Sequence, residues 1–179
     1  AGTGHGYAAT IGGDYGSYHH NLLAHNEGRN WSMSGGLDGG GSYAGHHDMF
    51  NNVCYNWRNR TTDGGTHQGQ FVNNYYKMGP ATTHTYLLTA DLEGTGKGSQ
   101  SYYVSGNIRE NRNGSLTTDK ENVTYRVNAE QKYDWDVFVD KPFFESYATI
   151  EPAKLAYKTT LSDVGCNQPF FDNHDTRMV

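Results

Sequence analysis

The segment MFNNVCYNW, residues Met49–Trp57, joins an asparagine pair to a short run of apolar and aromatic residues that closes on a polar turn. The same arrangement recurs in three further segments: YHHNLLAHN (Tyr18–Asn26), FVNNYYKMG (Phe71–Gly79) and YVSGNIREN (Tyr103–Asn111). With Asn21, Asn52, Asn74 and Asn107 taken as equivalent positions, the spacings are 31, 22 and 33 residues. The middle spacing matches one coil of a solenoid, and the other two match a coil that carries about ten inserted residues.

Asparagine suits a position that repeats once per coil. It tolerates left-handed backbone at turns, and identical amide side chains on successive coils can hydrogen-bond to one another as a ladder. Runs such as Tyr102–Val104 and Val123–Val127 are rich in β-branched and aromatic residues, which favour strands. We therefore predict an all-β fold, a parallel β-helix (solenoid), with the glycine-rich stretches Gly35–Gly45 and Gly94–Gly98 as loops. An antiparallel β-sandwich with asparagine-rich turns is the alternative.

The composition agrees with turn-rich β structure and excludes several protein classes. The 179 residues amount to about one domain by length, and an aromatic content of 13% is too high for a disordered chain. The net charge of −5 gives no basic footprint for nucleic acid, and no apolar run reaches the ~20 residues of a membrane span. From its ends we expect a processed product or a piece of a longer protein.

The two cysteines do not define the redox compartment. Cys54 and Cys166 lie far apart and fit neither a zinc nor a redox motif. A single disulfide between them and a pair of buried thiols are both open.

The last thirty residues change character. From Glu151 to Val164 the spacing gives one helical face to Ala153, Ala156, Tyr157, Leu161 and Val164. Pro152 is expected in the first turn and Gly165 just after the end. We predict a short amphipathic helix that lies against the side or end of the solenoid. The chain then divides into coils and loops over residues 1–148 and a packed helix and tail over residues 149–179.

The ordered series YHHNLLAHNEGRN, FNNVCYNWRNR and FVNNYYKMGPAT, which begin at Tyr18, Phe50 and Phe71, resembles polysaccharide lyase family 1, the pectate lyases. Within that family it is most similar to the gut-bacterial branch, as is the tail VGCNQPFFDNHDTRMV from Val164. The resemblance covers nearly the whole chain. It implies a right-handed parallel β-helix with asparagine ladders, of which this chain is the C-terminal half, and a secreted, periplasmic or cell-surface location.

The resemblance also implies an activity, the cleavage of 1,4-linked galacturonan by calcium-assisted β-elimination. In the family an arginine removes the C5 proton and the C4 oxygen leaves. Because the pKa of arginine exceeds ~12 in water, such a base needs nearby cations and a stabilised anion. Arg29, in Gly28-Arg29-Asn30, matches its position. Ser34 stands where the family has a second arginine, and no lysine lies around His5–Tyr7, where one is expected.

Calcium is the cofactor that the resemblance implies, and its ligands are expected outside this chain. The calcium-binding carboxylates of the family belong to coils before the HHN segment, whereas the first 20 residues here contain a single carboxylate, Asp14. We therefore predict calcium ligands upstream, on an N-terminal half or partner chain that completes the β-helix and covers its open coil. The other expected partner is pectic polysaccharide.

Three more residues are candidates for binding the uronan. Arg58 and Arg60, in NWRNR, offer guanidinium groups that pair with carboxylates, and His67 is expected to face the same groove. For Arg29 the alternative is a surface ion pair with Glu27. For Arg58 and Arg60 the alternative is a solvated turn.

Two other functions stay in view. A non-catalytic pectin- or uronan-binding β-helix is favoured by Ser34 and by the missing lysine. Glycoside hydrolysis needs two or three close acids, and its candidates, Asp134 and Asp136, lie beyond the four repeats, so it ranks last.

Histidine pairs and acidic residues suggest metal sites only weakly. Adjacent strand residues point to opposite faces, so one member of His19-His20 and of His46-His47 is expected in the core or ladder. We expect Asp172–Asp175 to be an exposed charged turn.

Overall fold

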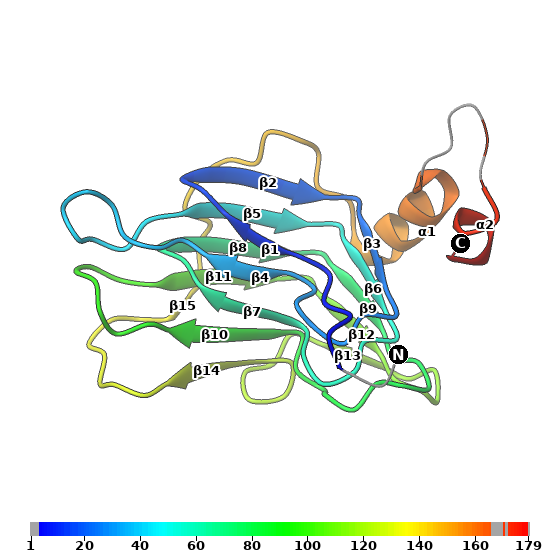
Figure 1. Ribbon diagram of the computed structural model, residues 1–179, viewed down its shortest axis with the longest axis horizontal. Coiled ribbons are helices and arrows are strands. Elements are labelled where there is room, and N and C mark those ends of the chain that lie inside the picture. The colour runs from blue at the N-terminus through cyan, green and yellow to red at the C-terminus, as the bar shows by residue number, and fades with distance from the viewer. Residues whose placement is uncertain (1–3, 166–169, 171, 179) are drawn as a thin grey trace.

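The computed structural model describes residues 4–165, 170 and 172–178, and its chain winds into a parallel β-helix (Figure 1). The chain passes through three sheets in turn, so strands one coil apart become hydrogen-bonded neighbours. The predicted all-β parallel β-helix is confirmed, and the β-sandwich alternative is wrong because successive neighbours run parallel.

We name each sheet after its first strand. The β1 sheet is entirely parallel and contains, in spatial order, β1 (Thr10–Gly12), β4 (Ser32–Ser34), β7 (Thr62–Gly65), β10 (Leu88–Leu92) and β14 (Tyr125–Ala129). The β2 sheet is also parallel and contains β2 (Tyr15–His19), β5 (His46–Phe50), β8 (Gln68–Val72), β11 (Ser101–Ser105) and β15 (Phe138–Val139).

The β3 sheet ends differently from the other two. It contains β3 (Leu22–Ala24), β6 (Val53–Tyr55), β9 (Tyr75–Lys77), β12 (Ile108–Glu110) and β13 (Leu116–Thr118). Its first four strands are parallel, whereas β13 turns back and pairs antiparallel with β12. This hairpin ends the third sheet.

The four asparagines of the repeat form the predicted ladder between the β2 and β3 sheets. Asn21 Nδ2 donates to Asn52 Oδ1 at 3.0 Å, Asn52 Nδ2 to Asn74 Oδ1 at 3.1 Å, and Asn74 Nδ2 to Asn107 Oδ1 at 2.9 Å. Asp119 Oδ1 ends the ladder by accepting from Asn107 Nδ2 at 3.2 Å. The side chains of Asn52, Asn74 and Asn107 are fully buried, so the ladder satisfies amides that water does not reach.

The residue before each ladder asparagine makes the turn. His20, Asn51, Asn73 and Gly106 all have positive φ, between 49° and 72°. Left-handed backbone is the conformation that glycine and asparagine adopt at least cost. The asparagine pair of the motif therefore has two tasks: the first residue turns the chain and the second bonds to the next coil.

The core lies inside the three sheets. Met49 of β5 and Phe71 of β8 are in register and almost completely buried. Leu88 and Ala90 of β10 belong to the same core and come from the β1 sheet. Tyr76 of β9 is the buried contribution of the β3 sheet. The inward residues alternate with outward ones, as the two-residue period of a strand requires.

The glycine-rich stretches are loops, as predicted, and they lie against each other. Both connect the β1 sheet to the β2 sheet, one before β5 and the other before β11. Tyr43 N–H donates to Lys97 C=O at 3.0 Å, and Lys97 N–H donates to Gly41 C=O at 3.0 Å. The coil between them, from β7 to β8, has no such loop, which explains its shorter repeat of 22 residues.

The predicted C-terminal helix is present as α1 (Ala153–Asp163), and a short α2 (Asp175–Met178) follows it. The expected bounds were too wide. Pro152 is the N-cap residue outside the first turn, because its extended ψ of 139° is not helical. The most buried face is Ala153, Ala156 and Thr160, whereas Tyr157 and Leu161 are half-buried.

Helix α1 lies against β6 and β9 of the β3 sheet. Asn51 holds its start, donating from Nδ2 to Glu151 C=O at 2.7 Å and accepting from Glu151 N–H at 2.8 Å. The ring of Tyr157 stacks on that of Tyr75, with centroids 4.5 Å apart. The predicted division between residues 148 and 149 stays a prediction.

Cys54 is fully buried, and burial raises the pKa of its thiol. Cys166 lies outside the described residues, so the predicted alternatives for the cysteine pair stay open. In the part of the chain that is described, neither helix has the length and apolar character to cross a bilayer.

Candidate functional site

The outer face of the β1 sheet carries a row of aligned residues, one from each strand. The row consists of Thr10, Ser32, Asp63, Thr89 and Arg126, which are aligned because neighbouring strands pair in register. On β10 the residues that flank Thr89 are Leu88 and Ala90, both fully buried in the core. One step further along β10 and β14, Asp91 pairs with Asn128. The sheet thus presents charged groups from several coils on one surface.

Arg29 lies in the turn just before β4, next to this row. Its backbone is left-handed, with φ 56°, which directs the chain from the β3 sheet into the β1 sheet. Its Nη1 donates to Thr10 Oγ1 at 3.2 Å, and its guanidinium carbon lies 4.7 Å from the centroid of the Tyr7 ring. Its Nε is buried and has no hydrogen-bond partner among the described residues.

Arg60 occupies the same turn one coil later and lies over the same ring, 5.8 Å from the Tyr7 centroid. Its Nε and Nη2 donate to the two carboxylate oxygens of Asp63 at 2.7 and 2.9 Å. The hydrogen bond with Asp63 is the main cause of the raised pKa of Arg60. Two guanidinium groups from neighbouring coils therefore share one tyrosine.

A depression of about 200 Å³ continues this surface across the later coils, and its lining includes Arg60, Asp63, His84, Thr89, Asp91 and Arg126. Burial raises the pKa of Asp91, and the negative charge of Asp63 adds to the effect. Burial lowers the pKa of His84, and the charge of Arg126 adds to that shift. The guanidinium of Arg126 in turn lies 4.4 Å from the ring centroid of Tyr86. We call the surface formed by Tyr7, Arg29, Arg60, Asp63, Asp91 and Arg126 the β1 face.

The structure brings together only two of the four residues that the sequence selected. Arg29 and Arg60 meet on the β1 face. Arg58 lies on the adjoining turn with a side chain 61% exposed and pairs with Glu27 at 3.2 Å. Glu27 is therefore the partner of Arg58, whereas the sequence offered it as a partner for Arg29.

His67 lies at the opposite end of β7 from Arg60. Its Nδ1 lies 2.8 Å from Ser99 C=O, and its ring meets that of His46 edge to face at 5.5 Å. It belongs to the turn between the β1 and β2 sheets, beside the glycine-rich loops, and is not on the β1 face.

Sequence reasoning missed Asp63, His84, Asp91 and Arg126. The signal for two of them, Asp91 and Arg126, was present in the alternation of LTADL (88–92) and YRVNA (125–129), where polar residues occupy every second position. Asp63 carries no such signal, because glycines follow it in TDGG.

The described residues contain no cluster of His, Cys, Asp and Glu side chains for a metal ion. In residues 4–165, 170 and 172–178 no three His, Cys, Asp or Glu side chains are grouped to hold a metal ion. The two carboxylates of the β1 face are also engaged, Asp63 by Arg60 and Asp91 by Asn128 at 2.7 Å. The expectation for the second histidine pair is met, since His47 is fully buried and His46 is not.

Comparison with known proteins finds no matching family model and no matching curated protein. The function is therefore argued from the geometry of the β1 face.

Proposed function

We propose that this chain binds 1,4-linked galacturonan on the β1 face and contributes the base of a uronan lyase, Arg29. The observation that carries the proposal is the pair of guanidinium groups, from Arg29 and Arg60, over the ring of Tyr7. Guanidinium groups bind carboxylates strongly and in two-point geometry. Arginines on successive coils present such groups along a sheet, as a polymer with a carboxylate on every sugar requires.

The chemistry is a β-elimination. Arg29, in its neutral guanidine form, takes the proton from C5 of a galacturonate residue. The electrons of that C–H bond form the C4–C5 double bond, and the C4–O bond breaks. The leaving glycosidic oxygen takes a proton from water, and Arg29 returns its proton to the solvent. The products are a shortened chain and an unsaturated uronate end.

Arg60 suits the role of the cationic neighbour that an arginine base needs. The resemblance to the lyase family places that neighbour at position 34, where this chain has serine. The next coil supplies the Arg60 guanidinium beside the ring of Tyr7 instead. Its charge attracts the substrate carboxylate. The prediction that calcium ligands lie upstream of this chain stays a prediction.

Ultraviolet absorbance of the unsaturated product tests the proposal. With calcium, polygalacturonate and the protein completed by its expected N-terminal half, we expect the absorbance to rise, and Arg29→Ala to lower the rate by about 10²–10⁴-fold. Arg177→Ala removes an exposed arginine on α2, far from the β1 face in sequence, and serves as the control. An equal rate for wild type and Arg29→Ala would contradict the assignment of Arg29.

A non-catalytic uronan-binding protein is the second candidate. It is favoured by the bidentate Asp63–Arg60 pair, which engages one guanidinium, and by Ser34. Calorimetry with tetragalacturonate separates the two. Binding without product supports the second candidate, and the absence of both binding and product contradicts both.

A further inference from the structure

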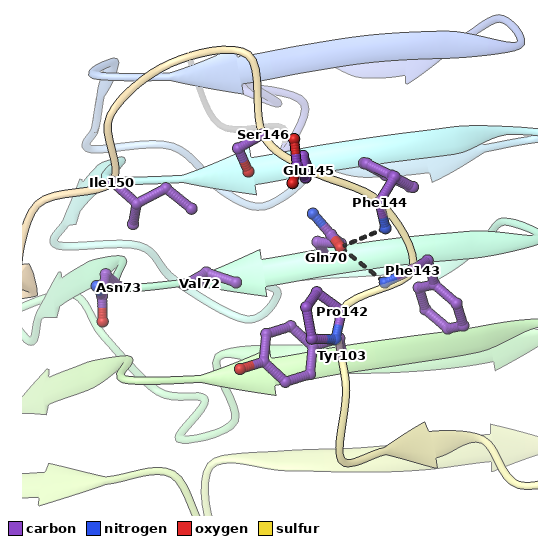
Figure 2. Close-up of a pocket in the computed structure, with 10 residues that line it drawn as sticks. All are labelled: Gln70, Val72, Asn73, Tyr103, Pro142, Phe143, Phe144, Glu145, Ser146 and Ile150. Atoms are coloured by element: carbon purple, nitrogen blue, oxygen red, sulfur yellow. Dashed lines mark hydrogen bonds between the residues drawn. The ribbon is translucent and has the colours of Figure 1, made fainter.

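A segment of the chain crosses the outer face of the β2 sheet. Residues 140–150, here the crossing segment, run from β15 over β11, β8 and β5 on the way to α1 (Figure 1 and Figure 2). Gln70 of β8 holds it, because its Oε1 accepts hydrogen bonds from Phe143 N–H at 2.9 Å and Phe144 N–H at 3.3 Å (Figure 2).

This contact fixes the orientation of the Gln70 amide, and the orientation decides which Gln70 atom meets Asp48. With Oε1 occupied, Nε2 of Gln70 donates to Asp48 Oδ1 at 3.1 Å. Asp48 is only 2% exposed, and its other oxygen, Oδ2, is buried without a hydrogen-bond partner among the described residues. A buried carboxylate oxygen that lacks a donor is costly. The site therefore favours a ligand that brings a hydrogen-bond donor.

Two cavities flank the crossing segment, and Phe144 lines both. The larger, of about 730 Å³, lies among Val72, Tyr103, Pro142 and Ile150, and its size is that of a small-molecule site, roughly 300–1,000 Å³. The smaller, of about 220 Å³, contains Asp48 together with Tyr15, Ser17, His46 and Tyr147. Together they offer room for two linked rings.

The aromatic side chains at the smaller cavity are exposed. Tyr147 is 93% exposed and Tyr15 is 71% exposed. The Tyr15 ring is held flat against that of His46, with centroids 4.4 Å apart and an 8° angle between the planes. Exposed aromatic faces beside a buried acceptor, one of them held by stacking, match a sugar ring, whose C–H face stacks on aromatics and whose hydroxyls donate.

The charged side chains around the two cavities favour an uncharged sugar over a uronate. Within the described residues no arginine or lysine lines either cavity, whereas Asp48 and Glu145 do. Asp14, paired with His46 at 3.1 Å, adds a third carboxylate nearby. A uronate is repelled here, in contrast to the β1 face with its three arginines.

We propose that the β2 sheet binds a neutral saccharide under and beside the crossing segment. The Asp48 carboxylate accepts hydrogen bonds from its hydroxyls, and Tyr15 and Tyr147 stack on its rings. The site is distinct from the β1 face and does not depend on lyase activity.

Isothermal calorimetry of the full chain with cellobiose, lactose and xylobiose, and with digalacturonate as the charged comparison, tests the proposal. We expect at least one neutral disaccharide to bind and digalacturonate to bind more weakly at this site. Tyr147→Ala should weaken the neutral binding at least about fivefold and Asp48→Asn about tenfold. Tyr133→Ala, which removes another exposed tyrosine, is the matched control and should leave affinity unchanged.

Because Tyr147 is almost fully exposed, its substitution tests the site without threatening the fold. The proposal is overturned if none of the three neutral disaccharides binds, or if the binding survives Tyr147→Ala. It is also overturned if Tyr147→Ala removes a tighter binding of digalacturonate. Neutral binding that persists in Arg29→Ala separates this site from the proposed lyase site.

Discussion

Single residues in this fold act through neighbours that are distant in sequence. Arg29 and Arg60 are 31 positions apart, yet both guanidinium groups lie on Tyr7, because each coil places its turn above the last. Asn74 shows the same principle in the interior. It accepts from Asn52 N–H and Nδ2 and donates to Asn107 Oδ1 and to Met49 C=O. A substitution at such a position therefore affects three coils.

Asn74→Ala should destabilise the protein by about 2–4 kcal/mol, because it leaves several buried partners without a hydrogen bond. The measurement is the free energy of unfolding from urea denaturation. Gln131→Ala removes an exposed amide and should change stability by less than about 0.5 kcal/mol. A loss for Asn74→Ala no larger than that of the control would show that the ladder contributes little.

His47 should make stability depend on pH. Burial is the main cause of its lowered pKa in the folded protein. The unfolded chain therefore binds more protons than the folded one as pH falls below the ordinary value of 6.5. The contribution of neutral His47 to the free energy of unfolding is fully present above that ordinary pKa. It is lost as the pH falls toward the lowered pKa of the folded protein.

Urea denaturation at a series of pH values between about 7.5 and 5.5 measures this effect, and His47→Gln should flatten the profile. His5→Gln, at an exposed histidine, is the control and should leave the slope unchanged. An equal slope in His47→Gln and wild type would assign the effect to other groups, His84 and His19 among them, whose pKa values are also lowered.

At the scale of strands and helices, the features that the sequence predicted are those with a local pattern. The ladder positions were found because the turn and the bonding asparagine recur in each coil, and α1 was found from its spacing between Pro152 and Gly165. The spacing of 31 residues between Asn21 and Asn52 also separates Arg29 from Arg60. The later coils differ in length by their inserted loops, so no fixed spacing relates Arg29 to Asp91 or Arg126.

The docking of α1 depends on small side chains against the β3 sheet. Ala156 is fully buried at this contact, where a larger charged group has no space or partner. Ala156→Glu should release the helix, which hydrogen exchange of the 153–163 amides would detect as loss of protection, at a cost of about 2–4 kcal/mol. Leu155→Glu, on the exposed side, is the control. Unchanged protection in Ala156→Glu would contradict this packing.

At the scale of the whole molecule, the three sheets share one open end. The strands β1, β2 and β3 each have a single neighbour among the described residues, so their other edges present unpaired N–H and C=O groups. The opposite end is better protected, since β13 folds back on β12 and Asp119 ends the ladder. Association should therefore occur through the first coil, with an N-terminal half or with a second copy of this chain.

Ser17→Pro tests that expectation. Asp14 C=O accepts from His46 N–H, and residues alternate in direction along a parallel strand, so the N–H of Ser17 faces the open edge of β2. Proline there removes an edge donor without breaking a bond to β5. In analytical ultracentrifugation we expect wild-type chain to associate as its concentration rises, and Ser17→Pro to associate less at equal stability. A wild-type chain that stays monomeric at high concentration would show that the first coil needs no partner.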